Sequence, residues 1–459
     1  MGDYSLNELI TISGSSGVGK TTLSEIIRFV LKDKNVTVVN GDDSHKWERQ
    51  DPNWNVYTHL NPKANNLTDE VKSISTLVQN KSIQRKKYNH DTGKFDEPVE
   101  ILPSKYIVYE GLHSLHGEMS EISDLRVFVE TENNLKKQWK LNRDTQKRGY
   151  TKKQVENILQ RREKDEKLYI APQKENADVI VRFEEKRDKT VHLEYECRDD
   201  VGKDIFEKVK DFYDLHRNFL LLCKKTSFEY DLVQHGGGNI SYKFDDSIVI
   251  TSSGKEMGDV SMLSGFTCCD HKGKKIKETK DRPSMELGLH LKIHQPVVFH
   301  THPIYLNTIL CSEESKDILS DVLVDYDYEY IPYITPGKDL KDFFNPEKES
   351  KIFLLENHGL ICSGNSFVEV FNISLHINQL CKEWLIKNSK AFKTFANLKM
   401  DENKFLFPDA VVLPEKMKPI NDYMIYIQRD IGLTPRFLTE SEINKLSSMK
   451  EEKYRRSLL

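Results

Sequence analysis

Short apolar segments alternate with stretches of helical periodicity in the first part of the chain. The apolar, β-branched segment 9–12 predicts a strand, and the apolar residues of 23–31 recur at helical spacing. Further strands are predicted at 36–39, 107–109, 124–129 and 177–183. This alternation is typical of an α/β fold in which helices cover a parallel sheet.

A polar, turn-rich stretch at 198–204 interrupts the pattern. Helical spacing resumes at Phe206 and continues to Leu222, and strands are predicted at 247–251, at 297–302 and from Lys351 up to His358. We therefore expect a first domain at 1–198, a second α/β/α domain at 199–400 and a C-terminal extension of that domain at 401–459.

Composition narrows the class of protein. A chain of 459 residues is long enough for two or three domains. The net charge of −4 and a pI near 6.5 provide no basic field for nucleic acid or a membrane surface. No apolar run reaches membrane-spanning length, and no secretory signal is expected. Seven scattered cysteines without a CxxC pair predict reduced thiols in a cytoplasmic protein.

The turn after the first predicted strand carries the pattern G-x-x-x-x-G-K-[ST]. Its residues are Gly14, Ser15, Ser16, Gly17, Val18, Gly19, Lys20, Thr21 and Thr22. Glycines let backbone N–H groups surround phosphates at the start of a helix, Lys20 can reach the β and γ phosphates, and the Thr21 hydroxyl can hold Mg²⁺. A glycine-rich turn that matches by chance is the alternative, and the strand–turn–helix context argues against it. The sequence predicts binding of ATP with Mg²⁺.

Two acidic residues follow predicted strands of the same sheet. Asp42 could act as a general base, hold Mg²⁺ or cap the next helix, and the sequence leaves these roles open. Glu110 ends the strand 107–109, as expected of an acid near the metal. Basic residues gather at 140–148, which alone would indicate a solvated face but beside a phosphate loop indicates a clamp on phosphoryl oxygens.

Several separated motifs in residues 8–185 resemble the phosphoribulokinase/uridine kinase family, and phosphoribulokinase more closely. They are the segments at 41–46 (GDDSHK), 58–65 (THLNPKAN), 88–93 (YNHDTG), 110–113 (EGLH), 143–151 (RDTQKRGYT) and 169–173 (YIAPQ). The resemblance implies that Asp42 is the base on a sugar hydroxyl and that Glu110 lies at the metal. It also implies sugar phosphate contacts for His45 and Arg49, and phosphate contacts for Lys140, Arg143 and Arg148.

The family resemblance further implies transfer to the C1 hydroxyl of a ketopentose 5-phosphate. Lys46 and Lys63 depart from the family's usual Arg and Glu. The acceptor is therefore expected to be a sugar or sugar phosphate whose identity stays open.

Histidines and glycine-rich loops carry the chemistry of the second half. His300 and His302 end one predicted strand and His358 ends another. Three histidines would leave the fourth position of a zinc ion open to substrate, although an H-x-H pair alone is a weak signal. The loops at 235–241 and 251–254 can form an anion-binding nest or two hairpin turns.

These pieces resemble the class II aldolase/adducin family over about 206–390, in family order. The motifs are 238–241 (GNIS), 251–254 (TSSG), 283–286 (PSME), 300–302 (HTH) and 357–359 (NHG), and 408–409 and 452–455 resemble the tails of longer members. The resemblance implies Zn²⁺ on His300, His302 and His358, with Glu286 as the base and sometimes a fourth ligand. It implies that the substrate phosphate is surrounded by Asn239, Ser253, Gly254 and Ser284, and that the chain forms a tetramer.

Two departures from the aldolase pattern affect the prediction. Met285 replaces a usual phosphate-binding Ser, and the catalytic Tyr cannot be aligned, with Asp321, Asp325 and Tyr326 in the right region. The leading hypothesis is a ketose or ketose phosphate kinase fused to a zinc-dependent ketose-1-phosphate aldolase that yields dihydroxyacetone phosphate and an aldehyde. The alternatives are a zinc-dependent epimerase or dehydratase, or a non-catalytic assembly domain. The expected partners are sugar phosphates and further copies of the chain, not nucleic acid or a membrane.

Overall fold

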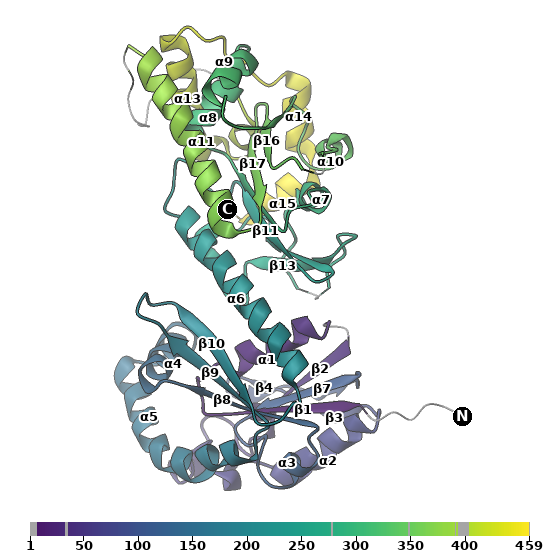
Figure 1. Cartoon of the computed structure of the whole chain (residues 1–459). Helices are drawn as coiled ribbons and strands as arrows, with labels where there is room; N and C mark the ends of the chain where they lie inside the picture. The colour runs from purple at the N-terminus through teal and green to yellow at the C-terminus, as the bar shows by residue number, and fades with distance from the viewer. Residues whose placement is uncertain are drawn as a thin grey trace, which may run out of the picture. The chain divides into compact units, whose positions relative to one another are not determined.

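The computed structural model describes residues 7–32, 35–276, 279–347, 349–390, 392 and 404–458. The chain divides into two compact units, 1–215 and 216–459, and each is described by itself (Figure 1). The division falls inside helix α6 (Lys203–Thr226), which follows the polar stretch 198–204. Within the described ranges, every helix is too short or too polar to cross a membrane. The predicted domain limits stay predictions.

The first unit is built on a six-stranded sheet (Figure 1). In spatial order its strands are β10 (Val191–Cys197), β9 (Val179–Glu185), β8 (Leu125–Thr131), β1 (Glu8–Ser13), β7 (Tyr106–Gly111) and β2 (Val36–Asn40). All neighbours are parallel except β10, which pairs antiparallel with β9. The five predicted strands are present. Strand β10 was not predicted, although its residues alternate between apolar and polar as in a half-buried edge strand.

Helices cover both faces of this sheet. Their bounds are α1 (Lys20–Val30), α2 (Leu67–Val78), α3 (Glu118–Glu121), α4 (Asn133–Lys147) and α5 (Lys152–Asp165), with a π-helical turn at Glu166–Ile170. Ile74 and Leu77 of α2 and Met119 of α3 pack on one face in a buried cluster with strand residues. Figure 1 shows α1 on the opposite face. Two small hairpins, β3 (Ile83–Arg85) with β6 (Val99–Ile101) and β4 (Tyr88–Asn89) with β5 (Lys94–Phe95), lie outside the sheet.

A buried ion-pair cluster supports the loop after β2. The guanidinium of Arg85 donates two hydrogen bonds to Glu70, at 2.8 and 2.7 Å, and one to Asp43 at 3.2 Å. All three side chains are at most one-tenth exposed. Because bidentate pairing satisfies these charges, their burial is tolerated. The contact of Arg85 with Asp43 also fixes the segment that contains Asp42.

The second unit is built on a seven-stranded sheet. In spatial order its strands are β13 (Phe266–Asp270), β12 (Ser247–Thr251), β11 (Asn239–Phe244), β14 (Val297–Thr301), β17 (Gly359–Gly364), β16 (Ile352–Leu355) and β15 (Glu329–Ile331). Neighbours are antiparallel except β15 and β16. The predicted strands at 247–251, 297–302 and 351–358 correspond to β12, β14 and β16, although β14 ends at Thr301 and β16 at Leu355.

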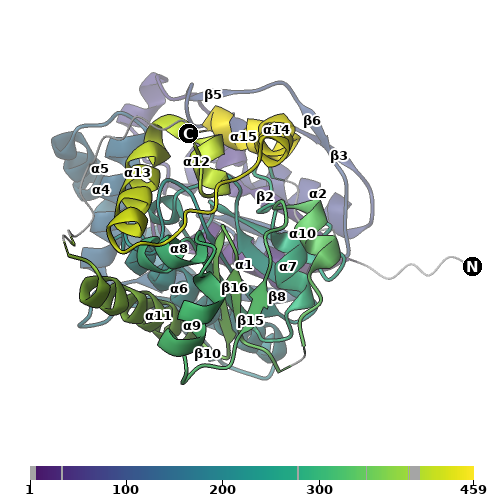
Figure 2. The same ribbon diagram turned by 90° about the horizontal axis from the view of Figure 1, so that it is seen from above.

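Helices of the second unit pack around this sheet. They are α7 (Leu287–Lys292), α8 (Ile304–Leu310), α9 (Ser315–Val322), α10 (Lys338–Phe343), α11 (Phe367–Asn388), α12 (Pro408–Val412), α13 (Pro414–Asp430), α14 (Glu440–Ser448) and α15 (Lys450–Leu458). Figure 2 shows the C-terminal helices α12, α14 and α15 side by side, in agreement with their contacts. A buried cluster that includes Leu289, Phe344 and Phe353 joins α7 and α10 to the sheet.

The Arg85 cluster generates a stability prediction. Arg85→Met leaves the carboxylates of Glu70 and Asp43 buried without their cation, so we expect the free energy of unfolding to fall by about 3–5 kcal/mol. Urea unfolding followed by tryptophan emission measures this, because Trp47, Trp54 and Trp139 all belong to the first unit.

Arg182→Met is the matched control. Arg182 pairs with Glu130 at 2.7 Å, but both side chains are about one-third exposed. A pair screened by water contributes about 1 kcal/mol or less, so this variant should unfold close to the wild type. Equal losses in the two variants would contradict the prediction.

Candidate functional site

The phosphate loop lies between β1 and α1, as predicted. Gly19 is the N-cap of α1 with φ of 98°, a left-handed conformation that favours glycine. A Cβ atom on Gly14 would lie 2.3 Å from the carbonyl oxygen of Val129, so this position has no room for a side chain. The Lys20 ammonium donates to the carbonyl oxygens of Gly14 and Ser15, both at 2.9 Å. The Lys20 ammonium is therefore held against the backbone of the phosphate loop.

Glu110 lies beside this loop because β7 pairs with β1 and aligns Glu110 with Ile12. Its carboxylate is buried, is hydrogen-bonded to Thr21, and has one oxygen, Oε2, without a hydrogen-bond partner among the described residues. Burial raises the pKa of Glu110 to about 7, although Lys20 opposes the shift. A buried carboxylate next to a threonine hydroxyl is a donor set that suits Mg²⁺, so the residues present fit that ion.

Asp42 and Asp43 are adjacent but do different things. The cap of the short 3₁₀ turn Gly41–Ser44 is Asn40, whose side chain accepts from the backbone N–H of Asp42. Asp43 is used by the Arg85 cluster. The Asp42 carboxylate instead faces two imidazoles, with oxygens 3.3 Å from His90 Nε2 and 3.8 Å from His45 Nε2. Of the three roles that the sequence leaves open for Asp42, capping of this turn is performed by Asn40.

The environment of Asp42 keeps it ionised. Burial raises the pKa of this carboxyl, but the hydrogen bond to His90 and the charges of His45, His90 and Lys20 outweigh burial, so its pKa lies well below the usual range. An ionised carboxylate beside a phosphate loop can accept a proton from a bound hydroxyl.

The three predicted phosphate-binding cations meet on one carboxylate. Asp144 accepts from Lys140 Nζ at 2.9 Å and from Arg143 Nε at 2.9 Å, and Arg148 Nη1 lies 3.5 Å away. Burial and the charge of Arg162 lower the pKa of Lys140 to about 8. Nη2 of Arg143 is buried and has no hydrogen-bond partner in the described part of the chain. The cluster is therefore assembled and retains donor capacity for an anion.

His45 and Arg49 are placed by their own neighbours. His45 is buried and its Nδ1 lies 2.8 Å from Asn65 Oδ1. The Arg49 guanidinium hydrogen-bonds to the backbone oxygens of His90 and Asp91, so it shapes the loop at 88–93. His90 then lies 3.3 Å from Arg148 Nη2. His90 and Asp144 lie within the motifs at 88–93 and 143–151, but the sequence predicted a role for neither.

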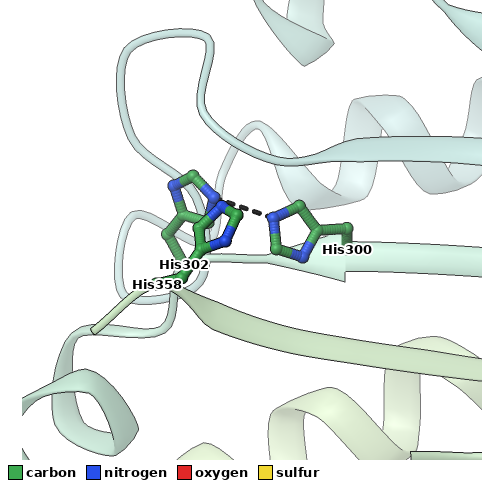
Figure 3. A group of neighbouring side chains, drawn as sticks. All are labelled: His300, His302 and His358. Atoms are coloured by element: carbon green, nitrogen blue, oxygen red, sulfur yellow. Dashed lines mark hydrogen bonds between the residues drawn. The ribbon is translucent and has the colours of Figure 1, made fainter. Parts of the chain in front are cut away.

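Three histidines from two segments of the chain converge in the second unit (Figure 3). His300 lies on β14, His302 directly follows that strand, and His358 lies in the turn between β16 and β17. Their ligand atoms lie within 4.8 Å of one another, and Nε2 of His300 is 2.9 Å from Nε2 of His302. His300 Nδ1 hydrogen-bonds to the carbonyl oxygen of Leu360 at 3.0 Å, which fixes a tautomer with a free Nε2 lone pair.

The Asn-His-Gly motif around His358 is explained by backbone geometry. Asn357 has φ of 52°, and its amide donates to the carbonyl oxygens of Leu406 and Arg436 at 2.6 and 2.7 Å. A Cβ atom on Gly359 would lie 2.3 Å from the carbonyl oxygen of Thr301. The two flanking residues thus turn the chain tightly against β14 and bring His358 to the other histidines.

Glu286 closes the fourth side of the histidine cluster. It is the N-cap residue of α7. Its carboxylate oxygens lie 3.3 Å from His300 Nε2 and 3.2 Å from His358 Nε2. Asn239 Nδ2 donates to the same carboxylate at 2.7 Å, so Asn239 orients Glu286, a role the sequence did not suggest. Three imidazoles and a carboxylate are a donor set that suits Zn²⁺, and the residues present fit this ion.

A pocket opens beside this cluster. Its lining includes the predicted Asn239, Ser253, Gly254 and Ser284 together with Gly236, Gly238, Ser252 and Met285. Because β11 and β12 are antiparallel, the start of one and the end of the other bring the two small-residue loops to one edge of the sheet. Ser284 also accepts from the Glu286 N–H at 3.3 Å. Asp321, Asp325 and Tyr326 are not among the residues that line the pocket, and the Tyr326 hydroxyl instead bonds to His376.

The C-terminal segment contributes three charged residues that site prediction missed. Asp409, Glu452 and Arg455 line the same pocket and are buried. Burial raises the pKa of Glu452 to about 7, although Arg455 opposes the shift. The sequence signal for them was the segments 408–409 and 452–455, which resemble the tails of longer family members but suggested no role. The spacing of Glu452 and Arg455 is a weak signal, because such pairs are common on exposed helices.

Comparison with known proteins identifies both units. The model of the Phosphoribulokinase / Uridine kinase family matches residues 9–190. A uridine kinase from Borrelia duttonii is 32% identical over 195 residues, which cover 40% of this chain and 91% of that protein. The chain belongs to the phosphoribulokinase/uridine kinase family. A phosphoribulokinase from a Synechocystis strain is 36% identical over 175 residues, 38% of this chain and 53% of that protein, so the chain spans about half the length of that curated relative.

The second unit has its own match. The model of the Class II Aldolase and Adducin N-terminal domain matches residues 218–385. Among solved structures, an L-fuculose 1-phosphate aldolase shares 20% identity with a TM-score of 0.31, and the match covers 38% of this chain and 86% of that one. The predicted fold class is confirmed: a phosphoribulokinase/uridine kinase domain with a P-loop sheet precedes a class II aldolase-like α/β domain.

Proposed function

We propose that the chain is a bifunctional enzyme of sugar metabolism. Its kinase domain would transfer the γ-phosphoryl group of ATP to C1 of a ketose or ketose phosphate. Its aldolase-like domain would cleave the ketose 1-phosphate reversibly into dihydroxyacetone phosphate and an aldehyde. The observation that carries the proposal is the presence in one chain of two assembled sites, Asp42 beside a phosphate loop and Glu286 beside three histidines.

In the kinase domain, each residue would have one task. Lys20 would contact the β and γ phosphates, and Thr21 and Glu110 would hold Mg²⁺, which neutralises developing charge when bound. Asp42 would accept the proton of the C1 hydroxyl. The cations gathered on Asp144 would contact phosphoryl oxygens, since Arg143 retains a buried donor for an anion.

In the aldolase-like domain, the pocket loops around Ser253 and Ser284 would receive the C1 phosphate through N–H and hydroxyl donors. Zn²⁺ on the three histidines would supply Lewis acidity to the ketose carbonyl. Breaking the C3–C4 bond requires one group that takes the proton from the C4 hydroxyl and one that gives a proton to C3. Glu286, whose carboxylate accepts a hydrogen bond from Asn239, would transfer the proton at C3, and Glu452 is a further buried carboxyl group of the pocket.

An epimerase or dehydratase is the second candidate for this domain. The observation that favours it is that the pocket lining, among the described residues, includes no tyrosine, although the aldolase resemblance implies a catalytic one. A non-catalytic role is the third candidate. The tetramer and the cytoplasmic location stay predictions.

The coupled reaction is tested by following two products together. We expect incubation with ATP, Mg²⁺, Zn²⁺ and a panel of ketoses and ketose 5-phosphates to yield ADP and dihydroxyacetone phosphate from one substrate, as detected by mass spectrometry. Glu286→Gln should keep ADP formation and accumulate the phosphorylated ketose. ADP without any three-carbon phosphate would favour the epimerase or dehydratase.

The adjacent aspartates allow a matched test of the kinase base. Asp42→Asn should lower phosphoryl transfer by about 10²–10⁴-fold, because the carboxylate that accepts the hydroxyl proton is lost. Nucleotide affinity should be retained, as measured by calorimetry. Asp43→Asn should lower the melting temperature, because Asp43 pairs with Arg85, while the folded fraction keeps its transfer rate. A fast Asp42→Asn variant would refute the assignment.

Glu452 is tested by separating the two steps. Glu452→Gln keeps the shape of the side chain but cannot exchange a proton, so cleavage of a supplied ketose 1-phosphate should slow by about 10²–10⁴-fold. ADP formation by the same preparation should be unaffected, and circular dichroism serves as the folding control. Unchanged cleavage would remove Glu452 from the mechanism and leave Glu286 in place.

A further inference from the structure

A buried chain of contacts runs from the C-terminal helix to one histidine of the cluster. His302 Nδ1 lies 2.8 Å from Asp409 Oδ2, and Asp409 Oδ1 accepts from Arg455 Nη1 at 2.6 Å. The three side chains are 7, 3 and 10% exposed. They come from the end of β14, from α12 and from α15, so contacts between distant segments assemble this chain.

The contact with Asp409 sets the tautomer of His302. When a carboxylate accepts from Nδ1–H, the Nε2 lone pair is left for a metal ion, and the ring is held in one orientation. Nε2 of His302 does face Nε2 of His300, at 2.9 Å. Asp409 is itself fixed because its second oxygen is held by Arg455.

The glycine loop of the pocket covers this pair of residues. A Cβ atom on Gly237 would lie 2.8 Å from Asp409 Oδ2 and 2.9 Å from His302 Nδ1. The backbone therefore passes directly over the hydrogen bond and keeps water from it, which strengthens a charge-assisted contact.

Helix α15 is attached by more than Arg455. Arg456 Nε donates to the carbonyl oxygen of Val412 at 2.7 Å, and the guanidinium of Arg282 lies 4.2 Å from the ring centre of Tyr454. Leu458 reaches Gly254, one of the pocket residues. Arg456 thus anchors the same helix without touching Asp409. A substitution of Arg456 therefore perturbs the attachment of α15 alone, whereas deletion of α15 would remove both this attachment and the contact of Arg455 with Asp409.

We propose that Asp409 and Arg455 are positioning residues that couple metal binding at the histidine cluster to the docking of α15. The inference rests on the proposed metal-binding function of that cluster. Because coupling is reciprocal, docking of α15 raises metal affinity by the same factor by which the metal favours docking. The helix that carries Glu452 into the pocket is then held in place when the metal site is loaded.

Zinc affinity of the full chain tests the coupling without any activity measurement. Affinity is measured by competition with a chromophoric chelator for the wild type, Asp409→Asn, Arg455→Met and Arg456→Met. An asparagine at 409 cannot accept from His302 and Arg455 at once, so we expect zinc to bind about 10–100-fold more weakly to it and to Arg455→Met. Arg456→Met removes an anchor of α15 but leaves the Asp409–Arg455 contact, so its affinity should fall by much less, and Arg455→Lys should restore part of the affinity.

Hydrogen exchange measures the reciprocal effect. We expect added zinc to slow amide exchange in α15 of the wild type and of Arg456→Met, but not in Asp409→Asn. Circular dichroism establishes that each variant is folded. If the wild type binds no zinc, the proposed function fails. If the wild type binds zinc and Asp409→Asn and Arg455→Met bind it equally well, the coupling is wrong while the metal site stands.

Discussion

Charge that is removed from water needs a partner, and both sites of this chain are arranged by that constraint. Asp144 gathers three cations beside the phosphate loop, and Asp409 joins Arg455 to His302 beside the histidine cluster. The carboxylates that hold these cations, Asp144 and Asp409, are not the ones assigned to proton transfer. Asp43 satisfies Arg85, which leaves its neighbour Asp42 free to face the two imidazoles.

Both domains bring the residues of their sites together through strand pairing, but the two sheets differ. In the first unit, parallel pairing aligns β1 with β7 and brings the phosphate loop and Glu110 to one edge. In the second, antiparallel pairing brings the loops before β11 and after β12 to one pocket. Side chains from distant parts of the sequence meet because backbone hydrogen bonds fix the register of the strands. The register determines where each strand ends, and therefore where each loop begins.

Most of this arrangement could be predicted where a motif is local. The phosphate loop, Glu110 and the three histidines could be predicted because each lies in a short pattern at the end of a strand, where the spacing of the residues determines which side chains meet. Strand β10 was not predicted although apolar and polar residues alternate regularly along it, so its pattern was a usable signal of an edge strand. Asp409, Glu452 and Arg455 escaped prediction because their burial depends on the docking of helices far along the chain, and a charged helix has the same sequence pattern whether it is exposed or docked.

The turn that carries His358 contains residues that are required for two different reasons. Asn357 and Gly359 are required by backbone geometry, namely a left-handed residue tied to two carbonyl oxygens and a close approach to Thr301. The histidine between them has no such backbone requirement, and its imidazole belongs to the histidine cluster. A chain with the asparagine and glycine but another residue at the centre would fold in the same way and lack the ligand. In comparisons of sequences, the asparagine and glycine of this motif therefore identify the turn, and the residue between them reports whether the third histidine of the cluster is present.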